Sequence, residues 1–144
     1  MKRNIVFFFS DQQRFDSLGV NGQSLPVTPN LDRFARESAV NFTRAYTPQP
    51  VCGPARSCLQ SGLYATQTGC YRNNIPLPQD IPTLARRLKA AGYNVGYVGK
   101  WHLGIGEGSA NMLTDACGPT PLESRGGYDD YWMASDLLEM TSHG

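Results

Sequence analysis

The order of hydrophobic and polar positions along the chain predicts strands that alternate with helices. Residues 4–9, NIVFFF, form an unbroken apolar run with β-branched and aromatic side chains. This pattern is typical of a strand that is buried on both faces, as in a parallel sheet. Residues 40–47 alternate apolar and polar positions and predict a second strand, and residues 93–98 predict a third.

Three helices are predicted between or beside these strands. The first follows Thr28, a capping residue, and Pro29, which suits the first helical turn; its apolar face carries Leu31, Phe34 and Ala35.

A second helix is predicted to begin near Pro54 and to end at Gly62. The third follows Asp80 and Pro82 and has an apolar stripe of Leu84, Ala85 and Leu88. Gly92 is its expected stop.

The later part of the chain has weaker signals. Residues 105–127 are rich in glycine and proline and predict a long loop, and residues 128–140 fit either a strand or a helix. The whole pattern predicts an α/β fold with a mostly parallel sheet and helices on both faces.

Polar side chains follow each predicted strand. Asp11 and Gln12 end the first strand, Cys52 comes shortly after the second, and Lys100 and His102 follow the third. Ligands in such folds gather beyond the carboxyl ends of parallel strands. We therefore expect these side chains to meet at one edge of the sheet.

Composition limits the class of protein. The chain has 144 residues and a net charge of +1, which suits one domain and gives no reason to expect nucleic acid or an anionic membrane as a partner. The apolar run at residues 5–9 is too short for a signal peptide or a membrane helix, so a cytoplasmic location is predicted. The four cysteines contain no Cys-x-x-Cys pair and are irregularly spaced, which argues against a zinc knuckle; the missing signal peptide argues against a disulfide framework.

Each polar cluster has a functional and a structural interpretation. Asp11 and Gln12 offer oxygen atoms to a hard cation, although an aspartate after a strand is more often a turn residue. Arg56, near a helix start, could grip an oxyanion, whereas a lone arginine is more often on the surface. Lys100 and His102 point the same way on an extended segment and could supply charge and a proton; the alternative is a solvated lysine and a packed histidine.

Cys52 is the remaining candidate. A tyrosine-phosphatase loop is excluded, because its arginine comes six places after the cysteine, and here that place holds Cys58 while Arg56 comes too early. A simple thiolate nucleophile and an inert buried thiol both remain open.

Several motifs together resemble the sulfatase family, which has the alkaline-phosphatase-like α/β fold. Residues 52–56, CGPAR, are similar to its Cys-x-Pro-x-Arg signature, and residues 96–104, GYVGKWHLG, to its second signature. Residues 4–19 look like the usual opening of the family, and residues 28–47 match the pattern expected before the cysteine. The resemblance implies that residues 1–144 are the N-terminal part of a sulfatase catalytic domain.

In this family a formylglycine-generating enzyme oxidises the cysteine of the first signature to formylglycine, an aldehyde. One hydroxyl of the hydrated aldehyde attacks sulfur, and the other collapses to the carbonyl and expels sulfate, so no stable adduct remains. The resemblance thus implies hydrolysis of sulfate esters of small molecules or carbohydrates, with Ca²⁺ or Mg²⁺ as cofactor. The implied catalytic residues are Cys52, Arg56, Lys100 and His102, and the implied metal ligands are Asp11, Gln12 and Cys52.

The sequence also departs from the family pattern. Gln12 stands where many members have a second aspartate. The Asp-Gln pair resembles a subgroup that includes choline sulfatases and phosphonate monoester hydrolases, so a phosphonate or phosphate monoester remains an alternative substrate. Ala55 replaces the commoner serine, and Gln60-Ser61 replaces Leu-Thr before the glycine.

Sulfatases are also several times longer, and their later half supplies further metal and sulfate ligands that His143 is not expected to replace. An incomplete fragment that acts only as a binding module is therefore a second alternative. An incomplete sheet would also leave an edge through which the chain could self-associate.

Overall fold

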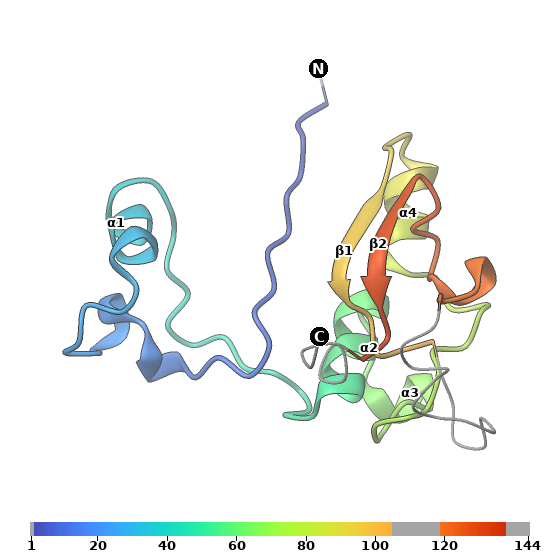
Figure 1. Ribbon diagram of the computed structural model, residues 1–144, viewed down its shortest axis with the longest axis horizontal. Coiled ribbons are helices and arrows are strands. Elements are labelled where there is room, and N and C mark those ends of the chain that lie inside the picture. The colour runs from blue at the N-terminus through green and yellow to red at the C-terminus, as the bar shows by residue number, and fades with distance from the viewer. Residues whose placement is uncertain (1, 105–118, 138–144) are drawn as a thin grey trace. The chain divides into compact units, whose positions relative to one another are not determined.

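The computed structural model describes residues 2–104 and 119–137, and it divides into two compact units, Met1–Tyr46 and Thr47–Gly144. We describe each unit by itself (Figure 1). The helices and strands are α1 (Pro29–Glu37), α2 (Cys52–Ser61), α3 (Ala65–Thr68), α4 (Leu84–Ala90), β1 (Gly96–Lys100) and β2 (Tyr131–Ser135), with short 3-10 helices at Phe15–Ser17, Gly19–Asn21 and Leu122–Ser124.

The first unit is organised around one carboxylate rather than an apolar core. Asp32, on α1, accepts hydrogen bonds from the Val20 amide (2.8 Å) and the Thr28 hydroxyl (3.1 Å) through Oδ1, and it is 6% exposed. The Thr28 hydroxyl also accepts from the Gly19 amide at 3.1 Å. Thr28 precedes the helix as predicted, but its side chain joins the preceding 3-10 turn to α1 and caps no helical amide.

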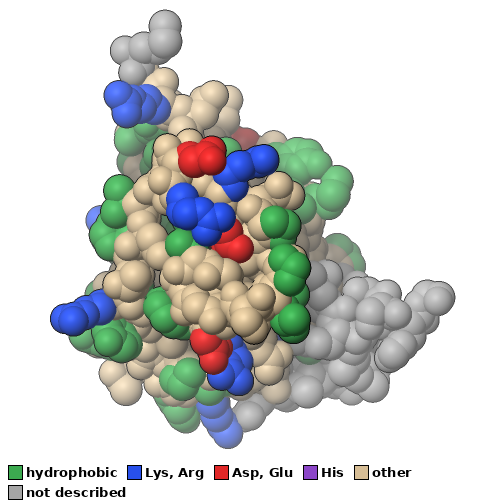
Figure 2. Space-filling view, turned by 90° about the vertical axis from the view of Figure 1, so that its left-hand side faces the viewer, with side chains coloured by type: hydrophobic (Ala, Val, Ile, Leu, Met, Phe, Trp, Pro, Cys, Tyr) green, Lys and Arg blue, Asp and Glu red, His purple; other side chains and the backbone are tan. Residues whose placement is uncertain are grey.

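The strands predicted at residues 4–9 and 40–47 are wrong for this structure, because neither segment forms a strand. Val6 is 92% exposed and Phe42 is 77% exposed. Among its described residues the first unit buries no hydrophobic side chain, and Figure 2 shows hydrophobic side chains lying open beside charged ones. A buried strand needs hydrogen-bonding partners as well as apolar residues, and the sequence pattern reports only the second condition.

The second unit contains a parallel pair of strands. β1 and β2 lie side by side, with Gly96 opposite Tyr131 and Lys100 opposite Ser135 (Figure 1). The parallel pairing agrees with the predicted fold class. β1 begins later than the strand predicted at residues 93–98, and the part of the ambiguous segment that forms β2, Tyr131–Ser135, is a strand.

Aromatic side chains form the core behind these strands. The Tyr97 ring packs against the rings of Trp101, Tyr128 and Trp132, with centroid distances of 5.1 to 5.4 Å. Leu88 of α4 packs against the same cluster. The opposite face of the strand pair has exposed apolar side chains at Val98, Tyr131 and Met133, so the described helices cover one face of this sheet rather than both.

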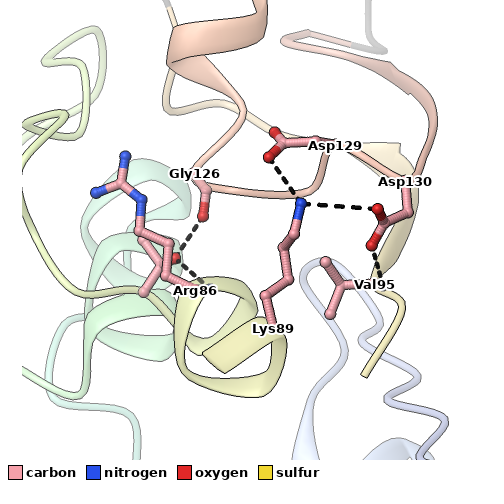
Figure 3. Close-up of polar contacts among 7 residues, drawn as sticks. Arg86, Lys89, Val95, Gly126, Asp129 and Asp130 are labelled. Atoms are coloured by element: carbon pink, nitrogen blue, oxygen red, sulfur yellow. Dashed lines mark hydrogen bonds and ion pairs between the residues drawn. The ribbon is translucent and has the colours of Figure 1, made fainter. Parts of the chain in front are cut away.

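The helices of the second unit agree closely with the sequence pattern. α2 ends at Gly62, whose φ is 73°, and α4 is followed by Gly92 with a φ of 77°; both are in the left-handed region that glycine adopts without strain. The cap of α4 is Thr83, whose hydroxyl accepts from the Arg86 amide at 3.2 Å and also donates to the Gly126 carbonyl (Figure 3).

Gly126, in the loop before β2, lies against the aromatic core. Its φ is 61°, and a Cβ there would lie 2.9 Å from Cη2 of Trp101. We predict that Gly126→Ala lowers the free energy of unfolding by about 3 kcal/mol, from the left-handed backbone and the steric overlap together. Gly62→Ala is the matched control, because its φ of 73° is similar and nothing lies within 4 Å; we expect a loss of about 1 kcal/mol. Urea unfolding checks both values, and equal losses would contradict the steric account.

Two further features complete the description. Within the part of the chain that the structure describes, no helix has the length and apolar character needed to cross a bilayer. Part of the predicted loop at residues 105–127, together with Cys117 and His143, lies outside the described residues.

Candidate functional site

Cys52 occupies the first position of α2. Val51 precedes it in an extended conformation, and the Cys52 side chain is half-buried. The next amide, Gly53 N–H, donates to Asn73 Oδ1 at 2.8 Å. A Cβ on Gly53 would lie 3.1 Å from that oxygen and 3.6 Å from the carbonyl oxygen of His102. The start of α2 therefore meets the backbone of His102, with Asn73 capping the helix from a distant part of the chain.

Arg56 joins α2 to the carboxyl end of β1. It is 6% exposed, and its Nη1 donates to the Lys100 carbonyl at 2.5 Å and to the Tyr97 hydroxyl at 3.2 Å. The Tyr97 hydroxyl donates to the same Lys100 carbonyl at 2.6 Å. The interpretation of Arg56 as a surface arginine is thus wrong, since its guanidinium is buried and holds the backbone at Lys100.

Tyr97 keeps its proton in this environment. Burial is the largest influence and raises the pKa of Tyr97; Arg56 lowers it and the nearby charge of Asp136 raises it, and the net shift is upward. The phenol thus remains a hydrogen-bond donor to Lys100 over the neutral range.

Lys100 and His102 are both 7% exposed, and the fully buried Trp101 lies between them. The segment is not extended as predicted: the φ of His102 is 58°, so the extended alternation that would turn both side chains the same way ends there. A non-glycine residue in the left-handed region is strained and persists only where its surroundings hold it, and such residues concentrate at functional sites.

Asp136 is a site residue that the sequence pattern missed. It follows β2 directly and is 2% exposed, and its Oδ1 accepts from the Leu103 amide (3.0 Å) and the Gly104 amide (2.8 Å). The same rule that selected Lys100, a polar residue at the carboxyl end of a parallel strand, would have found Asp136 if β2 had been recognised as a strand.

Asp11 and Gln12, the predicted metal ligands, belong to the first unit, and both are exposed. Gln12 has a φ of 57°, so it shares the left-handed conformation of His102. A carboxylate beside an amide oxygen suits a hard cation such as Ca²⁺, which takes about six to eight oxygen ligands. Over the described ranges, no three acidic, histidine or cysteine side chains form a metal cluster by themselves.

The described cysteines are free thiols in different environments. Cys70 is fully buried, its thiol donates to the Pro76 carbonyl at 3.3 Å, and burial raises its pKa. Cys58 is 8% exposed. Cys52 is therefore the most accessible of these three thiols, as a reactive cysteine must be.

Comparison with known proteins gives the family. The family model described as Sulfatase matches residues 3–142. The chain belongs to the sulfatase family. It is 44% identical over 133 residues to an ulvan-active sulfatase of Formosa agariphila, a match that covers 92% of this chain and 24% of the relative.

Solved sulfatase structures share the fold. The putative sulfatase yidJ from Bacteroides fragilis has a TM-score of 0.76 and 33% identity, and the match covers 90% of this chain and 30% of that one. Ps i-CgsB, solved in complex with k-i-k-neocarrahexaose, has a TM-score of 0.64 and 28% identity over 84% of this chain and 25% of that one. The predicted α/β, alkaline-phosphatase-like fold class is thereby confirmed, and the chain spans about a quarter of the length of the relatives that it matches.

Proposed function

We propose that this sulfatase-family chain is the N-terminal part of a sulfate ester hydrolase and carries its nucleophile, a formylglycine derived from Cys52. The junction at the start of α2 is the observation that carries the proposal. There Gly53 approaches the His102 carbonyl, while Arg56 on the next helical turn holds the Lys100 carbonyl at 2.5 Å. The accessible residue 52 and two buried basic residues are therefore tied to one small region.

Each residue of the proposed site would have a separate role in the reaction. Formylglycine, once hydrated, supplies one hydroxyl that attacks sulfur and another whose deprotonation releases sulfate. Lys100 supplies positive charge for the sulfuryl oxygens, and this charge acts strongly because the side chain is 7% exposed. His102 moves a proton at the leaving oxygen or at the second hydroxyl. Arg56 keeps the carboxyl end of β1 against α2.

Asp11 and Gln12 would hold Ca²⁺, or Mg²⁺, together with residue 52, because carboxylate and amide oxygens are the ligands that these cations prefer. When bound, the cation would offset negative charge on the sulfuryl group. Residues 1–144 would then form the N-terminal part of a sulfatase catalytic domain, and a formylglycine-generating enzyme would be the partner that matures Cys52.

Sulfated carbohydrates are the substrate class that the relatives favour. One relative is named for its activity on ulvan, and a structural neighbour was solved with k-i-k-neocarrahexaose. We extend that class to this chain as part of the proposal.

A chimera tests this function directly. Residues 1–144 would replace the matching quarter of the ulvan-active sulfatase, and the chimera would be produced together with a formylglycine-generating enzyme. We expect turnover of an aryl sulfate and of sulfated carbohydrate. A folded, matured chimera with no sulfatase activity would contradict the proposal.

Gln12 gives the second candidate, a phosphonate or phosphate monoester hydrolase that uses the same site. An amide in place of a second carboxylate leaves less negative charge at the cation, and such a site would suit an ester other than a sulfate. The same chimera, assayed with a phosphonate monoester, distinguishes the two: faster turnover of the phosphonate than of the sulfate would favour the second candidate.

A further inference from the structure

Two aspartates flank β2, and each binds backbone amides next to β1. Asp130 comes just before β2, and its Oδ2 accepts from the Val95 amide at 2.8 Å (Figure 3). Asp136 comes just after β2, and its Oδ1 accepts from the amides of Leu103 and Gly104. The strand pair is thus clamped at both ends by the same chemistry, but only the clamp at Asp136 adjoins Lys100 and His102.

The clamp at Asp136 holds a turn that would not keep its shape unaided. His102 has a φ of 58°, and the next two amides, of Leu103 and Gly104, both donate to the Asp136 carboxylate. Leu103 is 1% exposed, so its amide could not turn to water if the carboxylate were absent. The remaining support of this turn includes the Leu77 amide, which donates to the Leu103 carbonyl at 2.9 Å.

The register between β1 and β2 determines the position of Asp136. The Trp101 amide donates to the Ser135 carbonyl at 2.8 Å, one residue beyond the pair formed by Lys100 and Ser135. The pairing of β1 with β2 therefore fixes the backbone position of Asp136, and from this position its side chain reaches the turn.

We propose that Asp136 is a positioning residue that holds Lys100 and His102 in their working geometry. The catalytic part of this inference rests on the proposed function. The structural part rests on the hydrogen bonds that Asp136 accepts from Leu103 and Gly104. Asp136 binds the turn that follows His102, so it acts through the two basic residues.

Hydrogen exchange on the 144-residue chain tests the structural step. In Asp136→Ala we expect the Leu103 and Gly104 amides to exchange at least about tenfold faster, because both lose their acceptor. Asp136→Asn keeps an oxygen at the same place and should restore most of the protection. Asp130→Ala is the matched control: it should accelerate exchange at Val95 and leave Leu103 and Gly104 protected. Unchanged exchange of both amides in Asp136→Ala would overturn the inference.

The chimera tests the catalytic step. We expect Asp136→Ala to lower kcat about 100-fold while KM stays within about threefold, because misplaced catalytic groups affect the transition state more than substrate binding. Asp136→Asn should recover at least about tenfold of this loss, and Asp130→Ala should keep kcat within about threefold of the parent. Equal losses in Asp136→Ala and Asp130→Ala would show a general effect on stability and overturn the positioning role. If the parent chimera turns over no sulfate ester, the proposed function fails, and the exchange data still decide whether the clamp exists.

Discussion

Cys52→Ala reduces sulfate ester hydrolysis by the chimera about 10⁴-fold or more, because removing a covalent nucleophile abolishes the pathway that the other residues support. The structure gives Cys52 the accessible position at the start of α2 that such a nucleophile needs. Steady-state turnover of an aryl sulfate measures the effect. We expect KM to change little, since the substrate would still meet Lys100 and His102.

Cys58→Ala is the matched control for this variant. Cys58 lies on the same helix but is 8% exposed, and the proposed chemistry does not use it. We expect its chimera to keep turnover within about threefold of the parent, with a small loss of stability from the removed buried sulfur. If Cys52→Ala retains a tenth or more of the parent activity, residue 52 is not the nucleophile.

The second large effect concerns stability. Arg56→Ala should lower the free energy of unfolding of the 144-residue chain by about 3 kcal/mol, because the Lys100 carbonyl and the Tyr97 hydroxyl lose a charged donor in a buried place. Arg56→Lys should recover only part of the loss, since an ammonium cannot reproduce the geometry of the guanidinium fork. Urea unfolding measures these values.

Tyr97→Phe is the control for Arg56→Ala, because it removes the hydroxyl and keeps the ring in the aromatic core. Its two hydrogen bonds are to Lys100 and Arg56, and we expect a loss of about 1 kcal/mol. A loss in Arg56→Ala no larger than the loss in Tyr97→Phe would contradict the role of Arg56 as the tie between α2 and β1.

Local signals in the sequence predicted the helices of the second unit well. Pro54 and Gly62 correctly located α2, and Gly92 correctly located the end of α4. Such signals work because caps and stops act through residues that are close in sequence. The sequence pattern did not reveal the short helix α3 or the capping residue of α4, Thr83.

Features that depend on distant partners could not be predicted in the same way. The apolar run at residues 4–9 has the composition of a buried strand, yet in this structure it is exposed and forms no strand. β2 was ambiguous because five residues, Tyr131–Ser135, are too few to show a clear period. Pairing with β1 decided its conformation.

The candidate site was also predictable only in part. Motif resemblance selected Cys52, Arg56, Lys100 and His102, and the structure brings the backbones or side chains of all four to the junction of α2 and β1. Asp136 was missed because its role depends on the register of β2. The metal ligands Asp11 and Gln12 remain a prediction.

The mass of the peptide that contains residue 52 tests the central claim most directly. The chain would be produced together with a formylglycine-generating enzyme, digested, and analysed by mass spectrometry. We expect this peptide to be about 18 Da lighter than the cysteine form and to react with a hydrazide, as an aldehyde does. A peptide with the mass of unmodified cysteine, from cells in which a known sulfatase is fully converted, would contradict the account.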